Sequence, residues 1–211
     1  IPNRNSWKLL GVEEEQIMLS SILAVSIKVV LVLVAGEHAL EPCEARALFS
    51  QAEERLEKAI PKLDLKLWGV KEVAGSKALF VLDSRLPDYF TLRQELKSHL
   101  REKSILVVIA PPLISQTGGK FIGGVAQQTC GLSQYPMVVV NTFTEESTHY
   151  GPNALAHELG HILGAYHDDD TQLLMHSNAL FYSKNAVLPL SYISKKQIRK
   201  CLKRYSKNAS E

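Results

Sequence analysis

Apolar residues recur along the chain with two periods, one typical of strands and one typical of helices. Val29–Ala35 is rich in β-branched residues and predicts a buried strand. In Glu44–Ile60, apolar residues recur three and four positions apart, which predicts an amphipathic helix that ends before Pro61. A second strand is predicted over Asp64–Val73, and Ala78–Leu82 either extends it or forms a segment of its own.

The following segments continue the alternation of helices and strands. Tyr89–Arg101 predicts a helix, and Ile105–Ala110 predicts a strand. Phe121–Ala126 and Met137–Asn141 predict two more short strands. Strands that alternate with helices favour an α/β layer, in which a mostly parallel sheet carries the helices.

A last helix is predicted near the C-terminus, where Ser194–Gln197 has a capping-box pattern. Ile198, Cys201, Leu202 and Tyr205 follow at helical spacing, so we expect this helix to pack on the core by its apolar side. The remaining positions are strongly basic. We interpret them as a solvated helix face, with attraction of acidic matrix or glycan partners as the alternative.

The composition fits one globular domain with a sizeable core. Of 211 residues, 45% are apolar and 22% are charged, which argues against a disordered chain. A net charge of +2 is too small to indicate nucleic acid binding. The apolar run Met18–Ala35 raises the alternatives of a membrane span and an uncleaved signal segment. Lys28 in its middle and the β-branched residues favour a core strand, so we expect no membrane association.

The three cysteines, Cys43, Cys130 and Cys201, allow at most one intramolecular disulfide. One thiol therefore stays free or pairs with another chain, and the count supports an oxidising compartment only weakly. The sequence starts at Ile1 without a methionine, and Asn208 opens an N-glycosylation pattern. Both features fit a processed, secreted protein.

The segment with the clearest chemistry follows Pro152, which suits the first turn of a helix. On that helix His157 and His161, four residues apart, share one face and can bind the same metal ion. Gly164 lacks a Cβ, so it can adopt positive φ and turn the chain sharply out of the helix. This turn can bring His167 back as a third ligand.

Three protein ligands leave one coordination position for water, which distinguishes a catalytic zinc site from a structural one. Glu158 directly follows the first ligand, so we expect it to take a proton from the zinc-bound water and to pass it to the departing amine. The predicted function is a zinc-dependent endopeptidase acting on protein or peptide substrates. The alternatives are an inactive or weakly active binding module on the same scaffold and a membrane-tethered protease.

These residues resemble the metzincin clan of zinc peptidases, whose signature His-Glu-x-x-His-x-x-Gly-x-x-His matches residues 157–167 without a gap. Asp168 after the third histidine is similar to the adamalysin or reprolysin branch, which includes snake-venom metalloproteases and ADAM-type proteases; another metzincin branch is the alternative. The resemblance implies that Met175 forms a methionine turn, a hydrophobic floor beneath the metal. Leu174 stands where this branch typically has a cysteine.

The resemblance also implies the fold. We expect an α/β (α+β) metzincin fold, with a twisted, mostly parallel five-stranded sheet, an antiparallel edge strand, an active-site helix and a small irregular C-terminal subdomain that ends in a helix. Residues 1–211 would form a single catalytic domain. Within it we expect an N-terminal extension of unknown role at 1–27, an N-terminal subdomain at 28–164 and a C-terminal subdomain at 165–211.

The same resemblance implies a substrate-binding strand and a cofactor. The edge strand is expected to pair with an extended substrate through Gly123, Gly124, Val125 and Ala126. The expected cofactor is one catalytic zinc ion. The sequence has no convincing match to the calcium site of many relatives, which leaves calcium binding open.

The resemblance also implies which cysteines form a disulfide and that the protein is secreted. Cys130 and Cys201 resemble the pair that ties the edge-strand region to the C-terminal helix, which leaves Cys43 as the odd thiol, able to pair with another chain. We expect a monomer that is made as a latent precursor, is secreted into the extracellular space or a fluid such as venom, and is a target for proteinaceous inhibitors.

Overall fold

The computed structural model describes residues 24–35, 39–74, 104–110, 113–114, 121–122, 124–126, 136–141, 151–177 and 187–208, together with positions 94, 96, 98 and 130. Four predictions fall largely or wholly outside these residues: the N-terminal extension at 1–27, the segment Ala78–Leu82, the helix over Tyr89–Arg101 and the substrate contact by Gly123.

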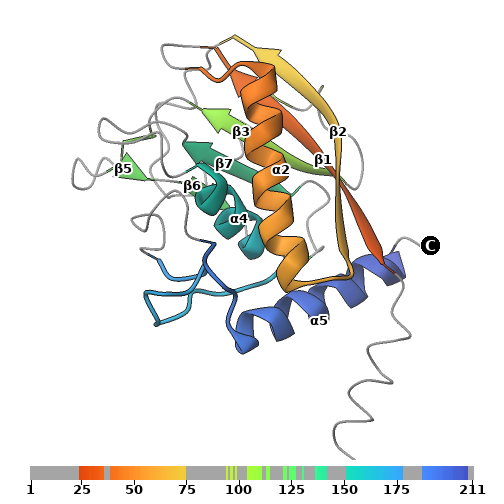
Figure 1. The fold of residues 1–211 in the computed structure, drawn as a ribbon. Helices are drawn as coiled ribbons and strands as arrows, with labels where there is room; N and C mark the ends of the chain where they lie inside the picture. Colours follow the sequence, from red (N-terminus) through yellow and green to blue (C-terminus); the bar gives the residue numbers. More distant parts are fainter. Residues whose placement is uncertain are drawn as a thin grey trace, which may run out of the picture.

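A five-stranded sheet forms the centre of the described part of the chain (Figure 1). In spatial order its strands are β2 (Leu63–Val73), β1 (Val25–Val34), β3 (Ser104–Ala110), β7 (Met137–Asn141) and β6 (Gly124–Ala126). Four strands run parallel, and β6 pairs antiparallel with β7. The predicted mostly parallel five-stranded sheet with an antiparallel edge strand is therefore confirmed.

Two predictions about strands need adjustment. The C-terminal half of the apolar run Met18–Ala35 is strand β1, so this half is not part of a membrane-spanning helix. The single strand predicted over Phe121–Ala126 is wrong in its extent. Phe121–Ile122 forms β5, which pairs with β4 (Leu113–Ile114) in a separate two-stranded sheet, and only the last three residues form β6.

Each face of the main sheet carries its own apolar cluster, as expected for parallel strands that are covered on both sides. Alternate residues of β1, such as Leu31 and Val32, belong to different clusters because successive side chains point to opposite faces. The larger cluster also holds buried apolar residues of the three described helices. The helix that carries His157 and His161 is thus packed on the larger of the two cores.

The three described helices are α2 (Pro42–Ala59), α4 (Gly151–Ile162) and α5 (Tyr192–Asn208). Figure 1 shows α2 and α4 against one side of the sheet and α5 crossing below them. The predicted helices at these places are confirmed. Among the described residues, no helix combines the length and the apolar character that a membrane crossing requires.

The start of α5 differs from the prediction. Ser191, not Ser194, caps the helix: the backbone N–H of Ser194 donates to Ser191 Oγ at 2.9 Å, and the helix begins at Tyr192. The side chain of Gln197 instead accepts a hydrogen bond from the backbone of Tyr166 at 3.0 Å. Ser191 and Ser194 both fit the sequence pattern of a helix cap. The contacts of α5 with the rest of the fold determine which of the two takes this position.

Candidate metal centre

Helix α4 places the first two histidines. It is buried over almost its whole length, and Leu155, Leu159 and Ile162 pack into the main core, as their spacing predicts. His157 and His161 lie one turn apart on another face, with ring centroids 4.7 Å apart. Because the helix is fixed by its apolar contacts, the two imidazoles are held in place before any ligand arrives.

Gly164 ends the helix and reverses the chain, as the sequence predicts. Its φ is +89°, a conformation that is costly for residues with a Cβ. The N–H of Gly164 donates to the carbonyl of His161 and the N–H of Ala165 donates to the carbonyl of Gly160, each at 2.9 Å, which together form a Schellman motif. Three residues after the glycine, the chain brings His167 to the first two histidines.

The three imidazoles meet at one point. His161 Nε2 lies 3.1 Å from His157 Nε2 and 3.1 Å from His167 Nε2, and the three residues form a group whose ligand atoms can hold one ion. Tetrahedral zinc with Zn–N bonds of about 2.0–2.1 Å requires ligand nitrogens about 3.3 Å apart. The arrangement therefore fits zinc with little adjustment.

Backbone carbonyls orient two of the three rings. His157 Nδ1 lies 2.6 Å from the carbonyl oxygen of Leu174, and His161 Nδ1 lies 2.8 Å from that of Ala165. When Nδ1 carries the proton and donates it to these carbonyls, Nε2 keeps its lone pair for a metal. The structure thus supplies the outer hydrogen bonds that a histidine ligand needs.

Burial lowers the pKa of the three histidines and raises the pKa of the neighbouring Glu158. It lowers the pKa of His157 to about 4, and it is the main cause that lowers the pKa of His161 and His167. The histidines are therefore neutral near pH 7, as metal ligands must be. Burial also raises the pKa of Glu158 to about 8, because its surroundings exclude the solvent that favours the charged form.

The side chain of Glu158 extends from α4 to the edge strand β6. It is buried, with 4% of its surface exposed. A Cβ added to Gly124 would lie 2.6 Å from Glu158 Cγ and 2.9 Å from Glu158 Oε1. The missing side chain at Gly124 therefore provides the space that the carboxylate occupies, which gives this glycine a role that the sequence did not reveal.

Met175 packs against helix α4 at Gly160, and its role in a methionine turn stays a prediction. It is fully buried, and a Cβ added to Gly160 would lie 2.5 Å from its sulfur. The sequence analysis did not identify Gly160. A glycine inside a helix costs roughly 1 kcal/mol relative to alanine, so its presence between two metal ligands was a signal of close packing.

Asp168 connects the third histidine to the start of α5. Its carboxylate accepts hydrogen bonds from Ser191 Oγ at 2.9 Å and from Ser194 Oγ at 2.8 Å. Its backbone N–H donates to the carbonyl of Met175 at 3.0 Å. The residue after the third ligand is thus fixed both to the methionine turn and to the last helix, which limits the movement of His167.

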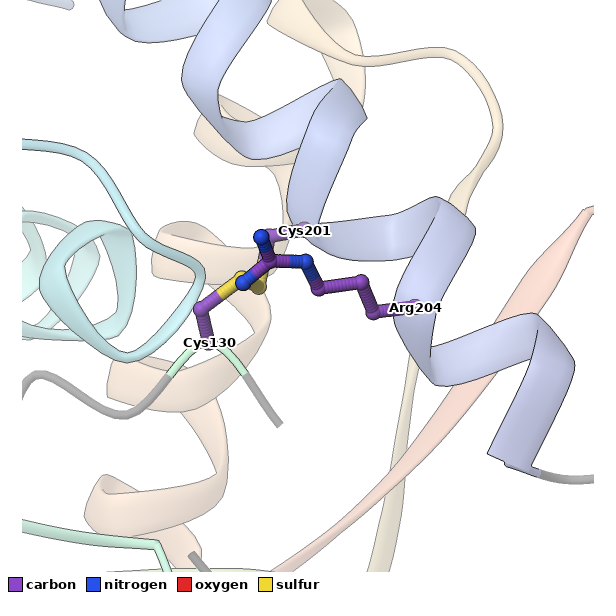
Figure 2. The surroundings of a disulfide bond; sticks show 3 residues. All are labelled: Cys130, Cys201 and Arg204. Carbon is purple, nitrogen blue, oxygen red and sulfur yellow. A yellow bond between two sulfur atoms is a disulfide. The ribbon is translucent and has the colours of Figure 1, made fainter. Parts of the chain in front are cut away.

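A disulfide joins Cys130 to Cys201 on α5, as the family resemblance implied. It lies directly behind the turn at Gly164: a Cβ added there would be 3.3 Å from Cys201 Cβ and 3.4 Å from Cys130 Cβ. Figure 2 shows the side chain of Arg204 extending over the bond, with Nη1 4.0 Å from Cys130 Sγ. Cys43 is free and exposed.

The predicted site residues that the structure describes fall into one connected region. The three histidines define the candidate metal position, with Glu158 and Met175 packed against neighbouring glycines. Gly164, Asp168 and the disulfide hold the returning chain. Val125 and Ala126 lie on β6 and are half-buried. Their contact with substrate stays a prediction.

Comparison with known proteins adds information about the fold. No family model matches the sequence, and no curated protein matches it. The structure is similar to metalloproteinase-II from Bacteroides fragilis, with a TM-score of 0.58 and 21% identity over 86% of this chain and 55% of that one. It is also similar to archaemetzincin from Methanopyrus kandleri, with a TM-score of 0.51 and 17% identity over 90% of this chain and 99% of that one.

The chain has a zinc metallopeptidase fold. It spans about half the length of the Bacteroides protein and nearly the whole of the archaeal one. At these identities the likeness shows the fold alone. The fold and the three-histidine group together fit one catalytic zinc ion.

Proposed function

We propose that this chain is a secreted zinc-dependent endopeptidase. One observation carries the proposal: three imidazole nitrogens converge on one point, and Glu158, the residue directly after the first of these histidines, is a buried carboxylate against the edge strand of the sheet. A structural zinc site, which is closed by four protein ligands, does not require an additional buried carboxylate. A hydrolytic site requires one as general base.

In this proposal His157, His161 and His167 bind the metal. A bound zinc ion supplies positive charge that polarises a peptide carbonyl, lowers the pKa of a neighbouring water and favours the ionised form of Glu158. Glu158 then accepts the proton of the attacking water at its carboxylate and transfers this proton to the departing amine. Helix α4 supports the exchange because it holds the carboxylate in a buried position.

Strand β6 binds the substrate in this proposal. Among the described strands it is the last in the order of the main sheet, and it pairs with β7 on one side. An extended peptide that pairs with the other edge gains backbone hydrogen bonds and lies next to the Gly124–Glu158 contact. Binding along a strand edge does not require a free chain end, which favours internal cleavage over removal of terminal residues.

The test uses a peptide library with acetylated N-termini and amidated C-termini. Wild-type protein with zinc is expected to cleave internal bonds, and Glu158→Gln is expected to keep one zinc per chain and to lose about 10²- to 10⁴-fold in kcat/KM. Glu72→Gln, the same change on an exposed position of β2, is the control and should match the wild type. Equal cleavage by Glu158→Gln and wild type would refute the role of Glu158.

The alternative of a binding module on the same scaffold predicts a different result in this assay. Such a module would bind zinc without cleaving any blocked peptide, or it would not bind zinc at all. The position of Glu158 favours the enzyme, because a buried carboxyl group without a catalytic task is costly to maintain.

The disulfide supports secretion. Bonds such as Cys130–Cys201 form and persist mainly in oxidising compartments. Recovery of the protein from culture medium, with Cys43 as its one alkylatable thiol, is the expected result. Three alkylatable thiols in material from a cytosolic fraction would argue against it.

The adamalysin or reprolysin branch is a finer proposal, which is supported only by Asp168 after the third ligand. The two similar structures do not distinguish this branch from other zinc metallopeptidases. A latent precursor, a place in venom and a monomeric state stay predictions from the family resemblance.

A further inference from the structure

Helix α5 concentrates positive charge. Its 17 residues include seven lysines and arginines and no aspartate or glutamate. The chain has 24 basic and 22 acidic residues, so the rest of it has 17 basic against 22 acidic ones, a net charge of −5. A strongly positive helix therefore lies on an otherwise negative molecule.

Much of this positive charge faces solvent, and among the described residues it has no salt-bridge partner. The apolar side of α5, with Ile198, Cys201 and Leu202, is buried in the fold, and the opposite side is exposed. Four of its basic side chains are exposed: Lys196, Lys200, Lys203 and Arg204. Within the described part of the chain, the salt bridges involve only residues of α2 and β2.

The arrangement is unfavourable for the helix itself. Like charges four residues apart repel each other on a helix surface. Within residues 192–206 of α5, four such pairs occur: Lys195 with Arg199, Lys196 with Lys200, Arg199 with Lys203, and Lys200 with Arg204. Lys195 and Lys196 also lie near the N-terminal end, where the helix dipole disfavours positive charge. A bound polyanion would relieve both effects.

The basic helix is attached to the metal centre. Ser191 and Ser194 at its start bind Asp168, and Gln197 binds the backbone of Tyr166, so residues 166–168 run alongside its first turns. The third ligand, His167, lies between these two anchor points. The positively charged surface therefore begins next to the candidate catalytic site.

Large apolar side chains are exposed at this junction. Tyr166 is 60% exposed, Tyr192 is 66% exposed and Ile193 is 62% exposed. Exposed aromatic and aliphatic side chains next to cations suit a polypeptide partner, which offers both apolar and acidic side chains. A sulfated glycan offers only the charge.

We propose that the exposed face of α5 is an exosite, a surface outside the catalytic centre that binds an acidic segment of the protein substrate. The proposal rests on the proposed peptidase function and names the substrate class: proteins with a run of acidic residues near the cleaved bond. Tyr166, Tyr192 and Ile193 contact the stretch of substrate between the catalytic centre and that run.

The dimensions of the helix match an extended acidic peptide. From Lys195 to Arg204 the stripe is about 14 Å long at 1.5 Å per residue, and successive basic residues in one row are about 6 Å apart. Alternate side chains of an extended peptide are about 6.7 Å apart on the same side. An extended run of about five residues can therefore place its acidic side chains along one row.

The binding test is independent of catalysis. A fluorescent peptide with a run of glutamates is titrated with Glu158→Ala protein, and the dissociation constant is read from fluorescence anisotropy at low and at high salt. Reversal of two charges, Lys196→Glu with Lys200→Glu, is expected to weaken binding about tenfold at low salt. The difference should largely vanish at high salt, because salt screens exposed charges.

The control is the double variant Lys66→Glu with Lys71→Glu, which changes the net charge by the same amount. Both lysines are exposed on β2, the strand at the opposite edge of the main sheet from β6. This variant should bind the acidic peptide like the parent protein. Equal loss in both double variants, or no loss in either, would overturn the exosite. So would stronger binding of heparin or of phosphatidylserine vesicles than of the peptide.

A kinetic test links the exosite to the reaction. Two blocked substrates share one cleavage sequence, and one of them carries an added acidic run. The wild type should have an about tenfold higher kcat/KM for the acidic substrate, and the charge reversal on α5 should remove this preference without changing cleavage of the plain substrate. Absence of all cleavage would contradict the proposed function, whereas cleavage without preference would contradict only the exosite.

Discussion

Replacement of Gly124 by alanine tests whether the edge strand positions Glu158, the proposed general base. The added Cβ would lie 2.6 Å from Glu158 Cγ and 3.0 Å from Glu158 Cδ. Carbon atoms in contact normally lie about 3.5–4.0 Å apart, so the side chain of Glu158 must move by about 1 Å. The three atoms nearest to the new Cβ all belong to Glu158, so the closest contacts fall on this side chain.

The size of the effect follows from this displacement. A misplacement of about 1 Å at a catalytic group can cost about 10²-fold in rate, which corresponds to about 2.7 kcal/mol in the activation free energy. We therefore expect Gly124→Ala to lower kcat about 100-fold while zinc content stays at one ion per chain. The free energy of unfolding should fall by about 1–3 kcal/mol, as is usual for overpacking.

Gly69→Ala is the matched control. Gly69 also lies in a strand of the main sheet, and a Cβ added there would meet nothing within 4 Å. Cleavage of a blocked peptide, zinc analysis by mass spectrometry and urea denaturation would be compared for both variants. If Gly124→Ala kept wild-type kcat with zinc bound, the contact between β6 and Glu158 would have no part in catalysis.

Further perturbations address the support of the metal centre. Gly160→Ala places a Cβ 2.5 Å from the sulfur of Met175, so we expect a loss of about 1–3 kcal/mol in urea denaturation and faster zinc transfer to a chelator; wild-type values would refute the close packing. Asp168→Asn weakens two charge-assisted hydrogen bonds to serines of α5 and should cost about 1–3 kcal/mol, with zinc affinity measured by chelator competition. The disulfide between Cys130 and Cys201 closes a loop with a sequence separation of 71, so replacing both cysteines by alanine should destabilise the fold by about 4 kcal/mol in denaturant titrations. Chelation should abolish peptide cleavage and added zinc should restore it, and full activity in excess chelator would exclude a metal-dependent reaction.

Much of the fold was predictable because its elements have strong local patterns. The β-branched run at β1 and the helical spacing in α2 both matched the structure within a few residues. The ends of the helices and strands depended on tertiary contacts, which cannot be read from local sequence patterns. Ser191 replaced Ser194 as the cap of α5 because the packing of residues 166–168 fixes where that helix begins.

The division of Phe121–Ala126 between two sheets shows the same limit. Gly123 and Gly124 weaken the strand pattern of this segment, but the sequence carried no sign that its first two residues would pair with β4. Strand pairing joins segments that are distant along the chain. Local propensity predicts that a strand forms but not which partner it takes.

The sequence by itself determined the chemistry of the candidate site. The spacing of His157, His161 and His167 around Gly164 is a local property, because one helix and one turn convert it directly into three converging nitrogens. The tertiary structure alone decided which residues support that chemistry. Gly124 meets Glu158 and Gly160 meets Met175 only because distant segments pack together, and such contacts leave no periodic trace in a single sequence.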